Sequence, residues 1–366
     1  MDLTFHGKRI SGMAVVVPER ERTFADDMAN FNFSPARSRK LAMVMGYDRH
    51  RVVEEGVCSS DLAVYAFEQL VAEHLLDLQT IDALVFLTVT PDYPMPPTSR
   101  IIHGRLGLRQ DVICLDLVQG CSAFEEGLVQ AFMLLEQPAI HKVAVVTSDV
   151  LSRKVSAKDR NSYPLIGDAA TVTIVEKDAS SSIPIVAFMK NDGSRALSLR
   201  IPAGGLRLPH SAATAEMKED AEGNFRSDDN LIMQGQDVFN FVMADVPKDL
   251  EELIVRSGKS KDEIDAYLFH QPNRFMLQKL AEKLGVPAEK MPANVVERWG
   301  NSSGGTVPAA TVLNYAERLC KETLTVFFAG FGVGLSWAGM IMNCGPLDFC
   351  RVFEYPNHSI KEDENE

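Results

Sequence analysis

The feature that most restricts the fold of this chain is the alternation of short apolar runs with longer amphipathic stretches. The apolar runs, each short enough to be a buried strand, cover residues 83–89, 112–118, 143–147, 171–175, 266–269 and 323–328. Apolar side chains also recur at helical spacing, with Leu62, Phe67 and Leu70 on one face of residues 59–76 and Phe124, Leu128 and Phe132 on one face of residues 122–135. Buried strands that alternate with helices are typical of an α/β fold whose sheets are covered on both faces.

The length of 366 residues is two to three times the usual domain size of about 100 to 200 residues. A polar seam at residues 176–182 divides the chain almost equally, and each part carries strand, glycine turn and helix in a similar order. We therefore predict two α/β halves, residues 1–178 and 179–366. Residues 190–230 are rich in glycine, proline and charge, and are predicted to be an excursion of loops and short turns that forms a lid or a pocket wall.

The charge balance argues against a bulk electrostatic role. Lys and Arg number 37 against 50 Asp and Glu, a net charge of −13 that disfavours nucleic acid and anionic membrane as partners. The acidic residues 361–366 are predicted to be a solvated tail. No stretch approaches the ~18 apolar residues of a membrane span, and the N-terminal residues lack the pattern of a signal peptide. The six cysteines show neither paired C-x-x-C motifs nor zinc-type spacing, so reduced thiols, a cytoplasmic location and no metal site are predicted.

Cys121 is the first candidate for chemistry. It lies where an apolar strand, a glycine turn and the start of a helix meet, in residues 116–124. A thiol in such a place is near the positive end of the helix dipole, which is expected to lower its pKa and to favour a nucleophilic thiolate. The alternative interpretation is a small buried apolar residue. No comparable setting is expected for the remaining cysteines: Cys58, Cys114, Cys320, Cys344 and Cys350.

His270 is the second candidate, because it ends the apolar run 266–269 just before a turn that contains Pro272. Strand ends are where ligands meet side chains in α/β folds. A histidine satisfied within the core is the alternative. A solvated surface position is expected for the other histidines: His6, His50, His74, His103, His141, His210 and His358.

Two glycine-rich segments complete the motifs. Residues 299–308 form a glycine-rich turn before a helix, without the Gly-Lys-Thr sequence of a P-loop, and Asn301 in this turn could donate a hydrogen bond to a carbonyl. Residues 329–337 at first look like half of a dinucleotide fingerprint. However, the sequence after Gly334 continues as a strand without a helix or a ribose-binding acid, so a backbone hairpin that offers N–H groups to a ligand is the better interpretation.

In this order, the four motifs resemble the β-ketoacyl-ACP synthase III family of the thiolase fold. They are Gly-Cys-Ser-Ala-Phe (120–124), Phe-His-Gln-Pro-Asn (269–273), Gly-Asn-Ser-Ser-Gly-Gly-Thr-Val-Pro (300–308) and Gly-Phe-Gly-Val-Gly-Leu-Ser-Trp (330–337). Supporting stretches lie at residues 60–63, 90–99, 158–160, 165–170 and 233–239, so the resemblance covers nearly the whole chain. It implies five layers, α-β-α-β-α, built from two duplicated halves, and a homodimer joined through the N-terminal halves.

The resemblance also implies the roles of individual residues. Cys121, His270 and Asn301 would form a Cys-His-Asn triad, and the backbone N–H groups of Cys121 and Val333 would bind an oxyanion. The substrate-binding residues would be Met95, Arg160, Arg274 and Phe331. No cofactor would be bound permanently, because coenzyme A or phosphopantetheine thioesters are the substrates.

The implied activity is a decarboxylative Claisen condensation in fatty-acid or secondary-metabolite biosynthesis. Cys121 would take an acyl group from acyl-CoA or an acyl-carrier protein, and a malonyl-type thioester would extend it. Two alternatives stay open: acyl transfer to an oxygen or nitrogen acceptor without decarboxylation, and a non-catalytic carrier-binding subunit. Asn301 favours condensation over simple acyl transfer, and the intact triad argues against a non-catalytic subunit.

Some positions depart from the family pattern. Gly120, Ala123 and Val333 differ in size from the usual residues and are expected to reshape the acyl pocket. Lys40 and Val44 stand where Trp and Arg usually grip the adenine end of coenzyme A, and Arg274 comes one residue early. The acyl donor therefore stays open between coenzyme A and a carrier protein, for which a basic patch is predicted from Arg37, Arg39, Lys40, Arg160, Arg207 and Arg274. Met95, in the loop 91–99, is predicted to close the acyl pocket of the neighbouring subunit and to admit chains longer than acetyl.

Overall fold

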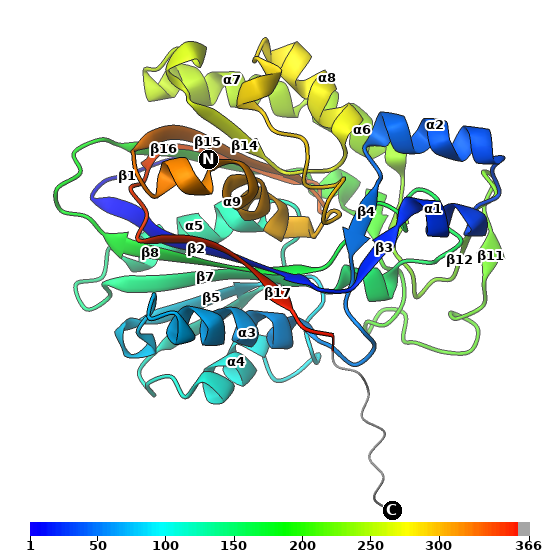
Figure 1. The fold of residues 1–366 in the computed structure, drawn as a ribbon, viewed down its shortest axis with the longest axis horizontal. Coiled ribbons are helices and arrows are strands. Elements are labelled where there is room, and N and C mark those ends of the chain that lie inside the picture. Colours follow the sequence, from blue (N-terminus) through cyan, green and yellow to red (C-terminus); the bar gives the residue numbers. More distant parts are fainter. Residues whose placement is uncertain (358–366) are drawn as a thin grey trace, which may run out of the picture.

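The computed structural model describes residues 1–357, so the predicted tail at 361–366 and His358 lie outside the described residues. Two sheets and three layers of helices alternate through the molecule (Figure 1). The larger sheet has the order β17 (Phe349–Tyr355), β2 (Lys8–Pro18), β8 (Ala169–Lys177), β7 (Lys142–Asp149), β5 (Ala83–Leu87) and β6 (Ile113–Leu117). The smaller sheet has the order β1 (Asp2–Phe5), β9 (Ile185–Asn191), β16 (Ser336–Cys344), β15 (Leu324–Gly332) and β14 (Ala266–Phe269).

Four strands of each sheet repeat one pairing pattern. In the series β2, β8, β7, β5 the pairs are antiparallel, antiparallel and parallel, and the series β9, β16, β15, β14 has the same order of pairs. The repeat confirms the predicted architecture of two duplicated halves.

The helices occupy three layers around the two sheets. Helices α5 (Ala123–Leu134) and α9 (Thr306–Leu319) lie between the sheets and contact strands of both. Helices α3 (Ser59–Ala72) and α4 (Thr98–Leu106) cover the outer face of the larger sheet, and α6 (Gly235–Ala244), α7 (Val246–Ser257) and α8 (Arg274–Leu284) lie on the outer side of the smaller one (Figure 1). The two short helices α1 (Phe24–Asp27) and α2 (Pro35–Met45) lie at one end of the molecule with α6.

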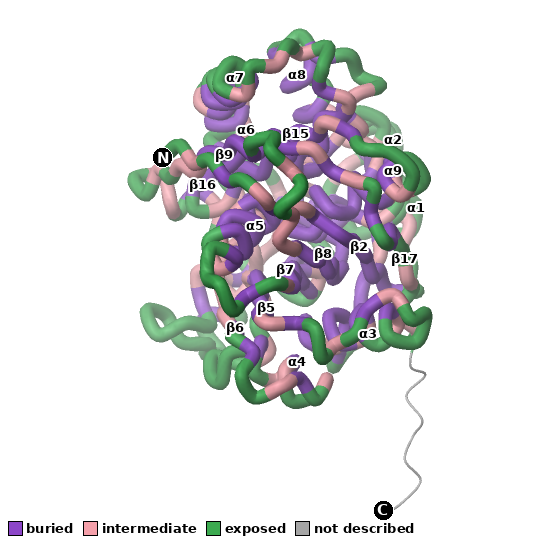
Figure 2. The backbone as a smooth tube through the Cα atoms, turned by 90° about the vertical axis from the view of Figure 1, so that its left-hand side faces the viewer, coloured by how far each residue is buried: buried purple, intermediate pink, exposed green. Residues whose placement is uncertain are grey.

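Burial is concentrated in the sheets and the middle helices (Figure 2). The Phe124 ring of α5 packs edge-on against Phe328 of β15, with centroids 5.2 Å apart. Because α5 is covered by a sheet on each side, it is apolar around most of its circumference, as a buried helix must be. This packing places the start of α5, which follows Cys121, between the two sheets.

The two halves exchange an edge strand, which the sequence did not predict. The connection from β8 to β9 contains the predicted boundary near residue 178, yet β1 pairs with β9 in the second sheet and β17 pairs with β2 in the first. Edge pairings between distant segments leave no local sequence signal.

The excursion at 190–230 is more ordered than predicted. It contains a 3-10 turn at Gly193–Ser198, a ribbon of β11 (Lys218–Glu219) with β12 (Phe225–Arg226), and the strand β10 (Leu199–Arg200), which pairs with β13 (Ile232–Met233) just beyond it. Arg226 forms ion pairs with Asp159 and Asp220 and so ties the ribbon to the body of the molecule. Among residues 1–357, no helix is both long and apolar enough to cross a membrane.

Candidate active site

Cys121 lies in the short turn between β6 and α5, one residue before the helix N-cap Ser122. A Cβ atom on Gly120 would come within 2.4 Å of Val333 Cγ1, so the residue before the cysteine has room only for glycine. A Cβ atom on Gly332 would come within 2.5 Å of the Cys121 Sγ atom. The end of β15 therefore passes directly over the thiol.

The pKa of Cys121 differs from the sequence expectation. Burial raises the pKa of the thiol to about 11, while the backbone N–H groups of Val333 and Cys121 act in the opposite direction. The nearby carboxyl of Asp149 also raises it. The expected lowering by the helix dipole was therefore wrong as the net effect, because the loss of hydration at the thiol outweighs the two backbone N–H groups.

His270 follows the last residue of β14, as predicted from the apolar run. Its backbone N–H donates to Ala329 O at 2.7 Å, and its ring Nδ1 lies 2.7 Å from Thr306 Oγ1 at the start of α9. The side chain is 2% exposed, and burial lowers the pKa of His270 to about 3. The imidazole is consequently neutral at physiological pH.

Asn301 is held by backbone on both sides. Its N–H donates to Leu165 O at 2.7 Å, and its C=O accepts from Gly167 N at 3.2 Å. The side-chain Oδ1 accepts a hydrogen bond from Ser303 N at 2.9 Å. Since that oxygen is engaged, the amide Nδ2 group is left as a donor.

These three side chains line one cavity of about 850 Å³. Arg160 and Phe331 line it as well, and the Phe331 ring meets the His270 ring edge-on at 5.8 Å. A second cavity of about 240 Å³ is lined by Cys121, Asn301, Val333 and a mainly apolar wall. Cys121 and Asn301 border both cavities, so the thiol lies where the larger cavity meets the smaller apolar recess.

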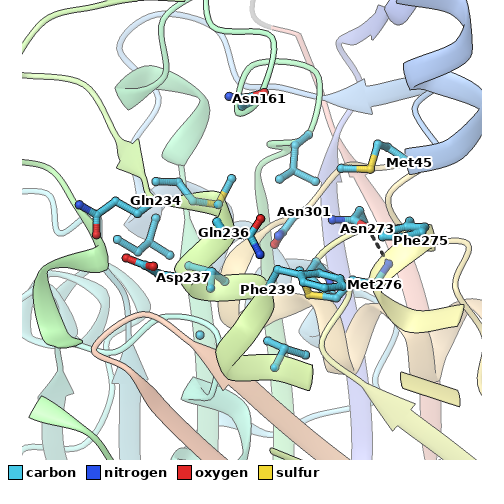
Figure 3. Close-up of a pocket in the computed structure, with 18 of the residues that line it drawn as sticks. Met45, Asn161, Gln234, Gln236, Asp237, Phe239, Asn273, Phe275, Met276 and Asn301 are labelled. Carbon is cyan, nitrogen blue, oxygen red and sulfur yellow. Dashed lines mark hydrogen bonds between the residues drawn. The ribbon is translucent and has the colours of Figure 1, made fainter. Parts of the chain in front are cut away.

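Figure 3 shows residues that the sequence analysis did not single out around the larger cavity. The rings of Phe239 from α6 and Phe275 from α8 stack with centroids 6.0 Å apart, and Met45 of α2 and Met276 of α8 also line the cavity. Three helices distant in sequence therefore build this apolar part. The helical spacing of α6 and α8 could have identified their apolar faces, but no local signal indicates that these faces meet.

The predicted substrate-binding residues have different surroundings. Arg160 is buried, donates hydrogen bonds to Glu222 O and Asn224 Oδ1, and lies 4.3 Å from the centre of the Phe33 ring. Arg274 pairs with Glu297 and, within residues 1–357, is not part of the lining of the larger cavity.

Met95 lies in the loop between β5 and α4, and its side chain is 83% exposed. In the described chain it borders neither of the two cavities at Cys121. Its predicted contact with a neighbouring subunit stays a prediction.

Two other expectations were wrong. Cys58 was expected to have no setting like that of Cys121, yet it is the N-cap of α3, and its backbone N–H donates to Asp61 at 2.7 Å. Its pKa is raised, mainly by burial and by the carboxylates of Asp92 and Asp61. His50 was expected at the surface but is buried. It lies in β4 (Arg49–Arg51), which pairs with β3 (Glu21–Thr23), and its ring nitrogens are bonded to Asp27 and Ile166 O. Within residues 1–357, no cluster of His, Cys, Asp or Glu side chains could hold a metal ion.

Comparison with known proteins identifies the family of this chain. Models of the 3-oxoacyl-[acyl-carrier-protein] synthase III family match residues 115–193, and those of its C-terminal part match residues 254–344. A β-ketoacyl-[acyl-carrier-protein] synthase III of Lactococcus lactis is 33% identical over 298 residues, which are 81% of this chain and 87% of the relative. A solved 3-oxoacyl-(acyl-carrier protein) synthase from Burkholderia xenovorans superposes with a TM-score of 0.89 at 33% identity, covering 97% of this chain and 99% of the other.

The fold and these matches define a condensing acyltransferase of the thiolase fold. The chain belongs to the β-ketoacyl-ACP synthase III family, and it is an enzyme of this kind. The resemblance drawn from the four motifs is thereby confirmed.

Proposed function

We propose that the chain forms an acyl-Cys121 intermediate and condenses it with a malonyl-type thioester by decarboxylation. The observation that carries this proposal is the meeting of Cys121, His270 and Asn301 in one cavity, with an apolar recess on the other side of the thiol. In the first step the Cys121 sulfur attacks the thioester carbonyl, the donor leaves as a free thiol, and the proton of Cys121 goes to that thiol. The N–H groups of Cys121 and Val333 stabilise the tetrahedral oxyanion.

In the second step the malonyl-type thioester loses CO2 and becomes an enolate. Asn301 Nδ2 and His270 Nε2 donate hydrogen bonds to its thioester oxygen, and the enolate carbon then attacks the acyl carbon and releases the Cys121 thiolate. This role requires the His270 proton on Nε2, which leaves Nδ1 as an acceptor. The Thr306 hydroxyl lies 2.7 Å from Nδ1 and 3.0 Å from Ser303 O, so in this role its proton turns from Ser303 O to the imidazole. The low pKa of about 3 supports a neutral imidazole in this role.

The smaller cavity supports an apolar acyl group longer than acetyl. Its wall includes Leu199, Ile201, Leu231 and Met233, which lie on or next to the paired strands β10 and β13. The excursion that carries β10 would thus act as the wall of the acyl site. A recess of about 240 Å³ with this lining offers hydrophobic stabilisation of about 0.8 kcal/mol for each buried CH₂ group.

We also propose a homodimer joined through β6. This strand is the last of the larger sheet, the exposed Val118 follows it directly, and Met95 is exposed in the loop between β5 and α4. An exposed strand edge with apolar neighbours favours pairing with another chain. Met95 would then reach the acyl recess of the partner subunit.

A carrier protein is the donor that the larger cavity favours. Arg160 is already engaged by Glu222, Asn224 and the Phe33 ring, which argues against its use as a platform for a nucleotide base. The basic residues Arg37, Arg39 and Lys40 lie exposed on α2, and none of them has an ion-pair partner among residues 1–357. Because Leu41, Val44 and Met45 of the same helix line the cavity, we propose that an acidic carrier protein docks on α2.

Two experiments test these proposals. Intact-protein mass spectrometry after incubation with acyl-CoA and acyl-carrier thioesters should give an added acyl mass on Cys121, and acylation that persists in Cys121→Ala would contradict the nucleophile assignment.

The second experiment tests docking on α2. The triple variant Arg37→Glu, Arg39→Glu, Lys40→Glu should raise KM about tenfold for the carrier-bound donor and leave KM for a short pantetheine thioester unchanged. Lys248→Glu on α7 serves as the charge control, and equal effects on both donors would exclude docking on α2.

A further inference from the structure

A buried chain of hydrogen bonds joins the turn that carries Cys121 to the turn between β15 and β16. Ser122 Oγ lies 2.9 Å from Ser336 Oγ, and Ser336 Oγ donates to the carbonyl oxygen of Val333 at 2.9 Å. On the other side, Ser122 Oγ lies 2.8 Å from Glu126 Oε1. Ser122 and Ser336 are both buried, so water does not compete for these bonds.

Gln119 extends this chain to the residues before the nucleophile. Its Nε2 donates to the same Glu126 oxygen, and its Oε1 accepts from the backbone N–H of Gly120 at 3.0 Å. Glu126 therefore anchors both sides of Cys121, with Gln119 before it and Ser122 after it. Through Ser336 the same anchor reaches Val333.

The two turns also pack closely against each other, because a glycine stands at each of two contact points. Val333 Cγ1 would lie 2.4 Å from a Cβ on Gly120, and Cys121 Sγ would lie 2.5 Å from a Cβ on Gly332. A small shift of the β15–β16 turn would therefore change the position of the Val333 N–H relative to the sulfur directly. Close-packed turns of this kind need an additional restraint if a donor is to stay aimed at one point.

Glu126 is the acceptor at the end of this chain. Ser122 Oγ and Gln119 Nε2 both donate to its Oε1 atom, so one carboxyl group holds the residues on either side of Cys121. Burial raises the pKa of Glu126, while these two hydrogen bonds act in the opposite direction.

We propose that Ser122, Ser336 and Glu126 are positioning residues that hold the Val333 N–H over Cys121 for oxyanion binding. They touch neither the substrate nor the reacting atoms and act through the two turns. This inference rests on the proposed role of the Val333 N–H in acyl transfer. It assigns to these residues an effect on the acylation step, because that step develops an oxyanion over Cys121.

The test compares two reactions of the same thiol. In Ser336→Ala and Glu126→Ala, the rate constant of acyl transfer from a pantetheine thioester to Cys121 should fall about tenfold, part of the 10²- to 10³-fold loss on removal of a donor. Alkylation of Cys121 by iodoacetamide, which forms no oxyanion, should stay within twofold of the unchanged protein. KM for the thioester should also stay unchanged, and Ser336→Thr, which retains the hydroxyl, should restore the acylation rate.

Controls separate this role from general destabilisation. Ser11→Ala removes another buried serine hydroxyl, which donates to Ile174 O in the larger sheet, and should leave acylation unchanged. The double variant Ser336→Ala, Glu126→Ala should lose no more than either single variant if the residues act as one chain. Equal losses in acylation and alkylation, or normal acylation in Ser336→Ala, would overturn the inference alone. Absence of acylation in the unchanged protein would overturn the proposed function and this inference with it.

Discussion

Replacement of Gly332 by alanine tests the close passage of β15 over the thiol. The added Cβ would lie 2.5 Å from Cys121 Sγ and 2.6 Å from Cys121 Cβ. An ordinary van der Waals contact needs about 1 Å more, so either the sulfur or the strand must move by about that distance. A misplacement of about 1 Å at reacting atoms can lower a rate about 100-fold.

We therefore expect Gly332→Ala to lower the rate of acyl loading on Cys121 about 100-fold. Overpacking should also lower the free energy of unfolding by about 1 to 3 kcal/mol. Acyl loading is measured by quenched-flow mass spectrometry with a saturating thioester, and unfolding by urea titration of the same sample.

Gly339 in the middle of β16 provides a matched control. A Cβ there would come within 2.7 Å of the Phe188 ring, so Gly339→Ala overpacks the core without touching the site. It should lower the unfolding free energy by a similar amount and leave acyl loading within about threefold. Equal acyl loading in the two variants would refute the packing of Gly332 on the thiol.

The remaining predictions concern the other groups of the site and one buried acid. His270→Ala and Asn301→Ala should still form the acyl enzyme but should release CO2 from a malonyl thioester at least ~100-fold more slowly, as measured with a labelled carboxyl group; equal losses in both half-reactions would contradict this division. Since the pKa of His270 is about 3, CO2 release should show no titration of His270 between about pH 5 and 9. Burial raises the pKa of Glu125 well above 4.5. As the pH rises from about 4.5 toward the pKa of the folded state, only the unfolded state releases this proton, so the free energy of unfolding falls. Glu125→Gln should consequently stabilise the protein against urea at about pH 8 more than at about pH 4, and an equal effect at both would show that Glu125 ionises normally. Met95→Trp should shorten the longest acyl chain loaded on Cys121, and an unchanged preference in a chain-length series would remove Met95 from the acyl site.

The sequence predicted the parts of the site that have a local signal. The apolar run 266–269 matches β14 residue for residue, and Asn273 caps α8 directly after it. The glycine hairpin at 329–337 connects β15 and β16 as expected. Each of these features depends on hydrophobic spacing and turn chemistry within about ten residues.

Features that depend on distant partners could not be predicted in this way. Nothing in the sequence near Arg160 indicates that Phe33 and Asn224 contact its guanidinium group. These partners come from distant segments, the one that precedes α2 and the ribbon at 218–226. The pKa of Cys121 depends on how far the tertiary fold removes water from the thiol, which the helix start alone does not reveal. The same limit applies to the exchange of β1 and β17.

The most direct test of decarboxylative condensation is a single turnover of isolated acyl enzyme. Protein carrying an acyl group on Cys121 is mixed with a malonyl thioester labelled at its free carboxyl, and CO2, product and protein mass are followed together. We expect equal amounts of released CO2, β-ketoacyl thioester and free Cys121. Discharge of the acyl group to an alcohol or amine without CO2 release would contradict the proposed function.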